Sequence, residues 1–315
     1  MPSADAVEHF VTLFDQGFLA MGLSLHRSLI EHAGNFHLWI ICMDEEVEQS
    51  LRQLALPQVS LIPLAQVETE QLLAVKGGRS RGEYCWTMTP FAPAAVLDRA
   101  PAAQQVTYLD ADLFFFADPQ ILLREFAESG KHVLITEHAF APEYDVAAAS
   151  GRFCVQFMTF RRTVPGLEVL HSWQAQCIEW CFARFEQDRF GDQKYLDAWP
   201  ARFPDAVHIL RQTDKTLAPW NASWFAARAP LAPVFYHFQG FRLVQGRQVV
   251  CWVGYRLGAS ARPLYQKYMA AMGDAIDRIE MLGRRVVRIP RQPGLRQQLR
   301  DLRDRLIGKA CWGQV

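Results

Sequence analysis

The feature that most constrains the fold is the alternation of strand-like and helix-like segments in the first third of the chain. Residues 9–14 (HFVTLF), 36–43 (FHLWIICM) and 59–64 are apolar runs typical of buried strands. Between them, apolar residues recur at helical spacing from Phe18 onward, and residues 47–56 have a second helical pattern. This β-α-β-α-β order predicts a mainly parallel sheet with helices on its faces.

The rest of the chain continues the alternation with one interruption. Residues 76–84 (KGGRSRGEY) contain three glycines and three basic residues, which predicts a mobile cationic loop. Residues 105–116 (QVTYLDADLFFF) read as a hydrophobic strand that contains two aspartates. Further strands are expected at 131–138, 153–162, 206–211 and 234–238, with helices at 90–98, 166–185 and 263–282, and from 118 and 191 onward.

Composition excludes several classes of protein. Half of the 315 residues are hydrophobic and the formal net charge is zero, so no overall field favours nucleic acid. No signal peptide is expected at the N-terminus, and no window provides the roughly 20 apolar residues of a membrane-spanning helix. The seven cysteines include no CxxC pair, which favours free thiols in a reducing cytoplasm.

The C-terminal region carries an uneven share of charge. Residues 284–309 contain nine Arg or Lys against two Asp. Within them, residues 294–309 have the pattern of an amphipathic helix. Two interpretations stay open: a helix docked on the domain with a solvated basic face, or peripheral attachment to an anionic membrane surface.

The central chemical motif is Asp110-Ala111-Asp112. In an extended segment, residues two apart point the same way, so both carboxylates can share one hard cation such as Mn²⁺ or Mg²⁺. Buried carboxylates are costly unless a positive group lies between them. In open parallel sheets, ligands bind beyond the carboxyl ends of strands, which is where this pair falls. A loop or helix-capping acid pair is the alternative.

Other candidates follow along the chain. His237 stands at the end of a strand-like run and could complete a metal site, although a core histidine is the plainer reading. Asp192 and Gln193 lie at a loop-to-helix junction, where capping is the alternative to a role beside a sugar. Trp220 could stack on a sugar and Asn221 could bind hydroxyls, or both could belong to a buried turn.

Together these motifs resemble the GT-A-fold glycosyltransferases, especially glycosyltransferase family 8 and its bacterial relatives. The order YLDADLFFF, then DQ, then HFQG carries the resemblance, over roughly residues 7–258. It implies an α/β GT-A (Rossmann-like nucleotide-diphospho-sugar transferase) fold, with a mixed, mostly parallel central sheet flanked by helices and a C-terminal helical tail. The implied organisation is a catalytic domain at 1–258, followed by C-terminal helices with the basic tail at 259–315.

The resemblance also implies roles for individual residues. The metal ligands would be Asp110, Asp112 and His237, with Mn²⁺ or Mg²⁺ as cofactor. Asp192 and Gln193 would lie beside the anomeric carbon of the donor sugar. The nucleotide-sugar would also be bound by a further group: Phe14, Asp15, Arg79, Arg81 and Arg242.

Two positions depart from the family pattern. Cys154 stands where the family usually has an Asn that contacts the sugar, and Leu243 stands where it has a phosphate-binding Lys. Arg242 is the nearest cation to the second position. The donor sugar therefore need not be galactose or glucose.

The implied activity is metal-dependent, retaining transfer of a hexose-type sugar from a nucleotide-sugar donor, with UDP-sugar favoured, to an acceptor hydroxyl. A glycan or lipid-linked acceptor in cell-envelope or surface polysaccharide synthesis is expected. The expected location is the cytoplasm, with peripheral contact at the inner face of the plasma membrane as an option.

Three alternatives remain at this level. A haloacid-dehalogenase-like phosphatase also uses a DxD, but it normally has Thr or Val where this chain has Phe114. A nucleotidyltransferase would need a glycine-rich loop after the first strand, and Gly17 stands alone there. A non-catalytic nucleotide-sugar-binding protein is the third.

Overall fold

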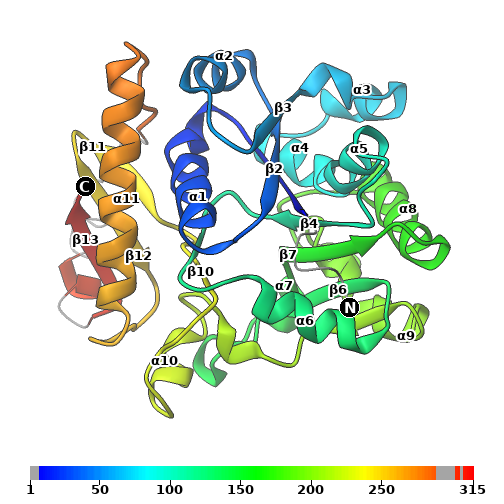
Figure 1. Cartoon of the computed structure of the whole chain (residues 1–315). Helices are drawn as coiled ribbons and strands as arrows, with labels where there is room; N and C mark the ends of the chain where they lie inside the picture. Colours follow the sequence, from blue (N-terminus) through cyan, green and yellow to red (C-terminus); the bar gives the residue numbers. More distant parts are fainter. Residues whose placement is uncertain (1–6, 289–301, 306–307) are drawn as a thin grey trace.

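A seven-stranded mixed sheet forms the centre of the protein in the computed structural model, which describes residues 7–288, 302–305 and 308–315 (Figure 1). Its strand order is β3-β2-β1-β4-β7-β6-β8. The strands are β1 (Glu8–Phe14), β2 (Phe36–Cys42), β3 (Val59–Pro63), β4 (Gln105–Leu109), β6 (Val133–Glu137), β7 (Phe153–Arg161) and β8 (Val207–Ile209). Helices flank the sheet, which agrees with the predicted α/β class.

The first half of the sheet is parallel, as the alternation predicts. β1 pairs with β2 over its whole length, β2 pairs with β3, and β4 lies on the other side of β1. The connections are α1 (Leu19–His32), α2 (Glu45–Leu54), α3 (Glu70–Lys76), α4 (Arg81–Met88) and α5 (Phe91–Arg99). The carboxyl ends of β1 and β4 therefore meet at one edge, where the strand order reverses direction. Such a reversal leaves a crevice for ligands.

The second half of the sheet brings β7 in antiparallel beside β4. Leu109 pairs with Phe157, and the Asp110 amide donates to the Gln156 carbonyl at 3.0 Å. Because β7 runs in the opposite direction, its beginning lies at the edge where β4 ends. Residues 154–156 therefore lie beside the aspartate motif. The helices of this half are α6 (Gln120–Ser129), α7 (Ala147–Ser150), α8 (Val164–Glu179) and α9 (Trp199–Arg202).

Two predicted elements differ in extent from the structure. The loop expected at 76–84 is limited to residues 77–80: α3 ends at Lys76, and α4 begins at Arg81 after a Ser80–Glu83 capping box. The Ser-x-x-Glu spacing is a helix-start signal that outweighs the glycines. Similarly, the helix expected from residue 191 begins later, as a 3₁₀ turn (Lys194–Ala198) that leads into the short α9.

Residues 105–116 form two strands rather than one. The chain turns at the aspartate motif, with the Leu113 amide bonded to the Asp110 carbonyl at 3.2 Å, and continues as β5 (Leu113–Phe115). β5 pairs antiparallel with β10 (Phe235–His237) in a separate sheet that also contains β9 (Thr216–Leu217). In this register Leu113 lies opposite His237, so the histidine is brought next to the aspartates.

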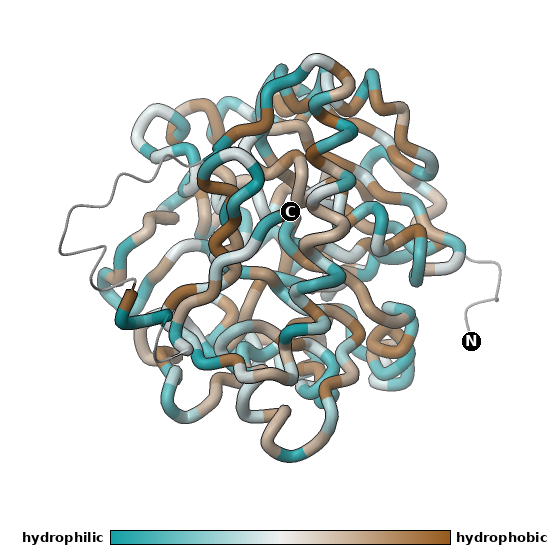
Figure 2. The backbone as a smooth tube through the Cα atoms, turned by 90° about the vertical axis from the view of Figure 1, so that its left-hand side faces the viewer, coloured by the Kyte–Doolittle hydropathy of each residue, from teal (hydrophilic) through white to brown (hydrophobic). Residues whose placement is uncertain are grey.

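The last part of the chain packs on α1. Helix α11 (Arg262–Met281) lies beside α1, next to a third sheet of β11 (Arg242–Gln245), β12 (Gln248–Val253) and β13 (Ala310–Gln314) (Figure 1). The short α10 (Ala222–Ala226) precedes them. β13 pairs with β12, so the chain's final segment is a strand within the region expected to be helical. The C-terminus lies on the face seen in Figure 2. The predicted helix at 294–309 lies mostly outside the described residues.

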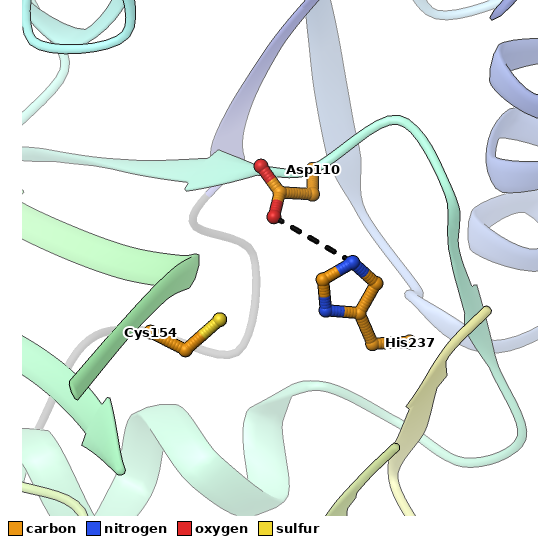
Figure 3. Close-up of side chains that lie close together, drawn as sticks. All are labelled: Asp110, Cys154 and His237. Atoms are coloured by element: carbon orange, nitrogen blue, oxygen red, sulfur yellow. Dashed lines mark ion pairs between the residues drawn. The ribbon is translucent and has the colours of Figure 1, made fainter. Parts of the chain in front are cut away.

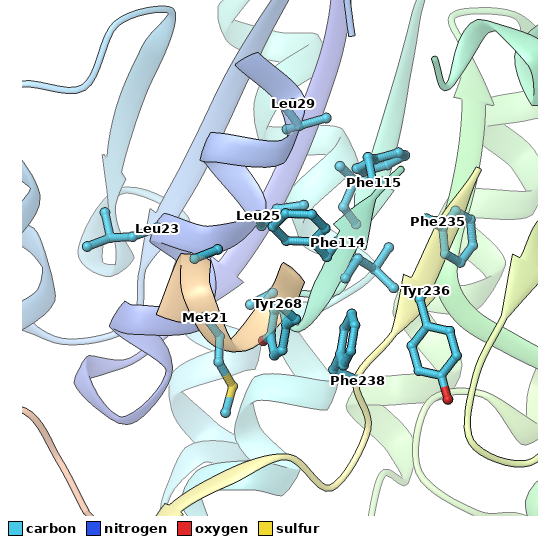
Figure 4. Close-up of a cluster of buried hydrophobic side chains, with 14 of the residues drawn as sticks. Met21, Leu23, Leu25, Leu29, Phe114, Phe115, Phe235, Tyr236, Phe238 and Tyr268 are labelled. Carbon is cyan, nitrogen blue, oxygen red and sulfur yellow. The ribbon is translucent and has the colours of Figure 1, made fainter. Parts of the chain in front are cut away.

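An aromatic and aliphatic cluster supports the two strands that carry the site (Figure 4). Phe114 from β5 packs edge-on against Tyr268 of α11, with ring centroids 5.8 Å apart. Phe238 stacks on Tyr268 at 3.8 Å, and its amide donates to the Asp112 carbonyl at 2.9 Å. Leu25 and Leu29 of α1 are fully buried in the same cluster. Packing and backbone pairing thus hold Asp112 and His237 together.

Replacing Phe238 with Ala should lower the free energy of unfolding by about 3–5 kcal/mol, because it removes a fully buried ring from this cluster. Tyr268→Phe is the matched variant. The buried Tyr268 hydroxyl has no hydrogen-bond partner among the described residues, so its removal should cost less than about 1 kcal/mol or stabilise the protein. Urea unfolding followed by fluorescence measures both, and equal losses for the two variants would contradict this account.

Candidate active site

A cavity of about 560 Å³ opens at the carboxyl ends of β1 and β4. Its walls come from both halves of the sheet and from the β10 region. It falls at the reversal of strand order that the fold provides for ligands. Eight of the ten predicted site residues line it: Phe14, Asp15, Asp110, Asp112, Asp192, Gln193, His237 and Arg242.

The two aspartates and His237 converge on one point of this cavity. His237 Nε2 lies 3.0 Å from Asp112 Oδ1 and 3.8 Å from Asp110 Oδ2. Both carboxylates approach the same group, as predicted, but the motif occupies a turn and not an extended strand. The pairing of β5 with β10 brings His237 to them.

Burial and mutual charge set the protonation of this group. Burial raises the pKa of Asp110 to about 8, against an opposing effect of His237. Burial would also raise the pKa of Asp112, but contact with His237 outweighs it and holds that pKa below its usual range. Burial would lower the pKa of His237, whereas the Asp112 carboxylate raises it well above the usual value. Asp110, Asp112 and His237 therefore share a proton, and its positive charge lies between the two carboxylates.

Gln156 orients the histidine, a role that the sequence analysis missed. Its Oε1 lies 2.8 Å from His237 Nδ1, and since a carbonyl oxygen only accepts, Nδ1 donates. Nε2 then faces the two carboxylates. Such a partner on the second ring nitrogen is typical of histidines that bind metals. Gln156 is a polar residue within the buried strand β7, and this is the sequence signal that could have indicated its role.

Cys154 of β7 belongs to the same cluster (Figure 3). Ligand atoms of Asp110, Cys154 and His237 all lie within 4.8 Å of one another, an arrangement that can hold a metal ion. The thiol is 3% exposed. Burial opposes its ionisation, but His138 and His237 outweigh that effect and lower the pKa of Cys154 to about 6. The residue that departs from the family pattern therefore lies at the centre of the site.

Asp192 forms a second acidic position in the cavity. It is 3% exposed, and its Oδ2 has no hydrogen-bond partner within the described part of the chain. Burial raises the pKa of Asp192 to about 7. The preceding Gly191 has φ +54°, and a Cβ there would approach the Trp86 ring to 3.3 Å, so a side chain is disfavoured. The fold thus places a buried carboxyl in the cavity wall, with one oxygen free of hydrogen bonds within the described part of the chain.

Gln193 is tied to the rim of the cavity. Its Nε2 donates to the Ser150 carbonyl at 2.6 Å, which fixes the amide against the end of α7. Trp220 also lines the cavity, and its Nε1 donates to the His138 carbonyl at 2.7 Å. Asn221 is fully buried and bonds only to backbone groups of residues 138, 216 and 218 among the contacts described, so the buried-turn interpretation holds for it.

The two loop arginines lie in different places. Arg81 is at the rim and forms ion pairs with both Asp15 and Asp44. Arg79 does not line the cavity: its guanidinium donates to the carbonyls of Cys177 (2.8 Å) and Ile178 (2.6 Å) at the end of α8. Those carbonyls lack helical partners, so Arg79 caps a helix end. Arg242 lines the cavity, with its guanidinium 5.3 Å from the Phe18 ring.

Comparison with known proteins gives close relatives. No family model matches the chain. The uncharacterized protein YfnD of Bacillus subtilis (strain 168) is 30% identical over 289 residues, covering 86% of this chain and 91% of YfnD. YfnF of the same strain is 32% identical over 256 residues, covering 76% of this chain and 84% of YfnF. The chain belongs to the family of YfnD and YfnF.

Solved structures relate this family's fold to glycosyltransferases. Mouse xyloside xylosyltransferase 1 matches with a TM-score of 0.50 and 14% identity, covering 75% of this chain and 98% of that one. The galactosyltransferase LgtC, crystallised with donor and acceptor sugar analogs, gives 0.51 and 13%, covering 84% and 95%. The bifunctional glycosyltransferase WbbM gives 0.52 and 14%, covering 91% and 53%. The predicted GT-A fold is confirmed.

Two features of the chain bear on contact with a membrane: its helices and the basic segment at 284–309. Within the described ranges, every helix is too short or too polar to span a bilayer. Most of the basic segment at 284–309 falls outside those ranges.

Arg79→Ala should lower the free energy of unfolding by about 1–3 kcal/mol, because it leaves carbonyls at the end of α8 without their donor. Arg81→Ala is the control. That side chain is 62% exposed, and exposed ion pairs contribute at most about 1 kcal/mol. Denaturant unfolding of the two variants tests the assignment, which fails if Arg79→Ala is as stable as Arg81→Ala.

Proposed function

We propose that this protein is a metal-dependent glycosyltransferase that uses a nucleoside diphosphate sugar, with UDP-sugar as the first candidate. The observation that carries the proposal is the convergence of Asp110, Asp112 and His237 in a cavity at the carboxyl ends of β1 and β4 of a GT-A fold. A centre that shares one positive charge between two buried acids suits a divalent cation.

The residues present fit such a cation. Asp110 and Asp112 supply carboxylate oxygens, and Gln156 holds the Nε2 of His237 toward them. Carboxylate and imidazole donors suit Mn²⁺, and carboxylates also suit Mg²⁺. When bound, the cation neutralises charge that develops on the departing nucleoside diphosphate.

The nucleotide is assigned to the β1 side of the cavity. Phe14 is at the end of β1, and Asp15 follows it with its carboxylate paired to Arg81. The Phe14 ring is 2% exposed and packs against Gly22, so Phe14 contributes mainly to the shape of this wall. The Asp15 carboxylate offers an acceptor for ribose hydroxyls. Arg242, whose guanidinium is 5.3 Å from the Phe18 ring, provides positive charge for the phosphates.

The donor sugar is assigned to the side of Asp192 and Gln193. The ionised Asp192 carboxylate stabilises positive charge at the anomeric carbon as the glycosidic bond breaks. Its unpaired Oδ2 and the apolar surroundings strengthen that effect, since few competing hydrogen bonds are present. Retention of anomeric configuration and a hexose-type sugar remain part of the proposal.

The acceptor is a hydroxyl of a glycan or lipid-linked glycan of the cell envelope. The cavity has aromatic walls that include Trp86, Phe190, Trp220 and Tyr255. Aromatic faces bind the apolar faces of sugar rings and exclude water from the reacting centre. A cytoplasmic site for the reaction belongs to the same proposal.

Asp112→Asn should remove metal-dependent nucleotide binding, because it deletes the charge of the carboxylate nearest to His237. For wild type, UDP with Mn²⁺ at about 100 times its dissociation constant should add about 2.7 kcal/mol of stability, which a thermal-shift assay detects. Asp205→Asn, at an exposed position, should keep the full shift. An unchanged shift in Asp112→Asn would contradict the metal assignment.

Asp192→Asn should leave UDP binding unchanged and lower turnover by about 10²–10³-fold, because it removes the charge beside the anomeric carbon. The wild-type rate should rise with pH through about 7, since burial raises the pKa of Asp192 and the carboxyl is neutral below that pH. Release of UDP from a panel of UDP-sugars, followed against pH, measures the turnover of the variant and the pH profile of the wild type. A variant that keeps the same pH profile would show that another group titrates.

A further inference from the structure

Strand β7 contributes two polar side chains from one face to the metal centre. Residues two apart on a strand point the same way, so Cys154 and Gln156 both face the turn that holds Asp110. Gln156 Oε1 holds His237 Nδ1, whereas the Cys154 thiol enters the cluster itself (Figure 3). One strand thus orients one ligand and adds a further donor atom.

We propose that Cys154 is a direct thiolate ligand of the ion held by Asp110 and His237, so that this centre prefers Zn²⁺, Co²⁺ or Fe²⁺ over Mg²⁺. The inference rests on the proposed function, because it concerns the ion of the same centre. It adds a sulfur donor to the oxygen and nitrogen donors already assigned. On binding, the thiol releases its proton to solvent.

The distances suit one ion. Bonds of about 2.0–2.3 Å to oxygen, nitrogen and sulfur place two ligand atoms of a tetrahedral site about 3.3–3.8 Å apart. The separation of His237 Nε2 and Asp110 Oδ2 is 3.8 Å, and all three ligand atoms lie within 4.8 Å. Small side-chain rotations therefore bring the thiol into bonding range.

Independent elements hold the three donors. Asp110 follows β4, Cys154 lies near the start of β7, and His237 ends β10. Backbone pairing fixes β7 against β4, and β10 against β5, so the cluster does not depend on one flexible loop. Asp112, with Oδ1 3.0 Å from His237 Nε2, is placed to supply a fourth donor.

The donor set decides the metal preference. Thiolate favours Zn²⁺ and similar borderline ions, whereas Mg²⁺ requires oxygen ligands in near-octahedral geometry and keeps its waters. A centre with one sulfur, one imidazole and two carboxylates therefore discriminates against Mg²⁺. Substrate phosphate oxygens can still enter, because the cavity leaves the open side of the cluster accessible.

A plain core cysteine is the competing explanation. Cys154 also packs against Ala218 and Trp220, and a buried thiol needs no ligand to be stable. The two explanations differ in what happens when Cys154→Ser removes the sulfur without a large change in volume. The matched control is Cys85→Ser, because Cys85 lines the same cavity but lies beside Asp15 and Arg81 rather than in the cluster.

The experiment is titration of the full-length metal-free protein with Co²⁺, followed by absorption spectroscopy. We expect a thiolate-to-cobalt charge-transfer band in wild type and in Cys85→Ser, and its loss in Cys154→Ser. Competition with Zn²⁺ should show affinity falling on the order of 10–100-fold in Cys154→Ser. The affinity for Mg²⁺ should change by less than about twofold, since oxygen ligands remain.

The outcomes separate this inference from the proposed function. A wild-type cobalt complex without the band, or equal Zn²⁺ affinity in wild type and Cys154→Ser, would overturn the sulfur ligand. If UDP still bound with Mn²⁺ in that case, the proposed function would stand. A cysteine-dependent band without binding of UDP, GDP, ADP, CDP or dTDP in the presence of any of these ions would support the sulfur ligand and remove the proposed function.

Discussion

The pairing of β5 with β10 is the interaction on which the site depends. It places His237 opposite Leu113, and the adjoining hydrogen bond from the Phe238 amide to the Asp112 carbonyl closes the junction. Both strands are short and fully buried, so their position comes from packing against α1 and α11 more than from their own length. Without that packing, two buried carboxylates would face each other without a compensating positive group, which is unfavourable.

The sequence predicts the parallel half of the fold well, because the apolar periodicity there is local and each strand is followed by its own helix. It also identifies the aspartate motif, whose position after an apolar strand is a local feature. The antiparallel half is harder, since the neighbours of β7 and β10 come from distant segments. The contacts of Gln156 and Cys154 with the aspartate and histidine cluster could not be predicted for that reason, because they depend on a register that no local pattern specifies.

The errors have specific physical causes. At 76–84, glycine and charge suggested a loop, but the Ser80–Glu83 capping box satisfies the first amides of α4 and starts a helix. In the aspartate motif, an extended backbone was assumed and the chain instead turns, although the carboxylates still converge. The family resemblance implies that Arg79 binds the nucleotide. A guanidinium has five N–H donors, but those of Arg79 bond to free carbonyls at the end of α8 and not to a group in the cavity.

The charge balance of the cavity supports the proposal that a cation accompanies a bound diphosphate. Arg81 at the rim is already shared between Asp15 and Asp44, so little of its charge is free for phosphate. Arg242 is the only Arg or Lys in the wall of the cavity as far as the described chain extends. Besides this guanidinium, the wall has the proton that His237 shares with the acids at 110 and 112. In the proposed function, a diphosphate beside these acids and Asp192 would leave an excess of negative charge. A divalent ion held by Asp110, Asp112 and His237 would offset that excess where the phosphates approach.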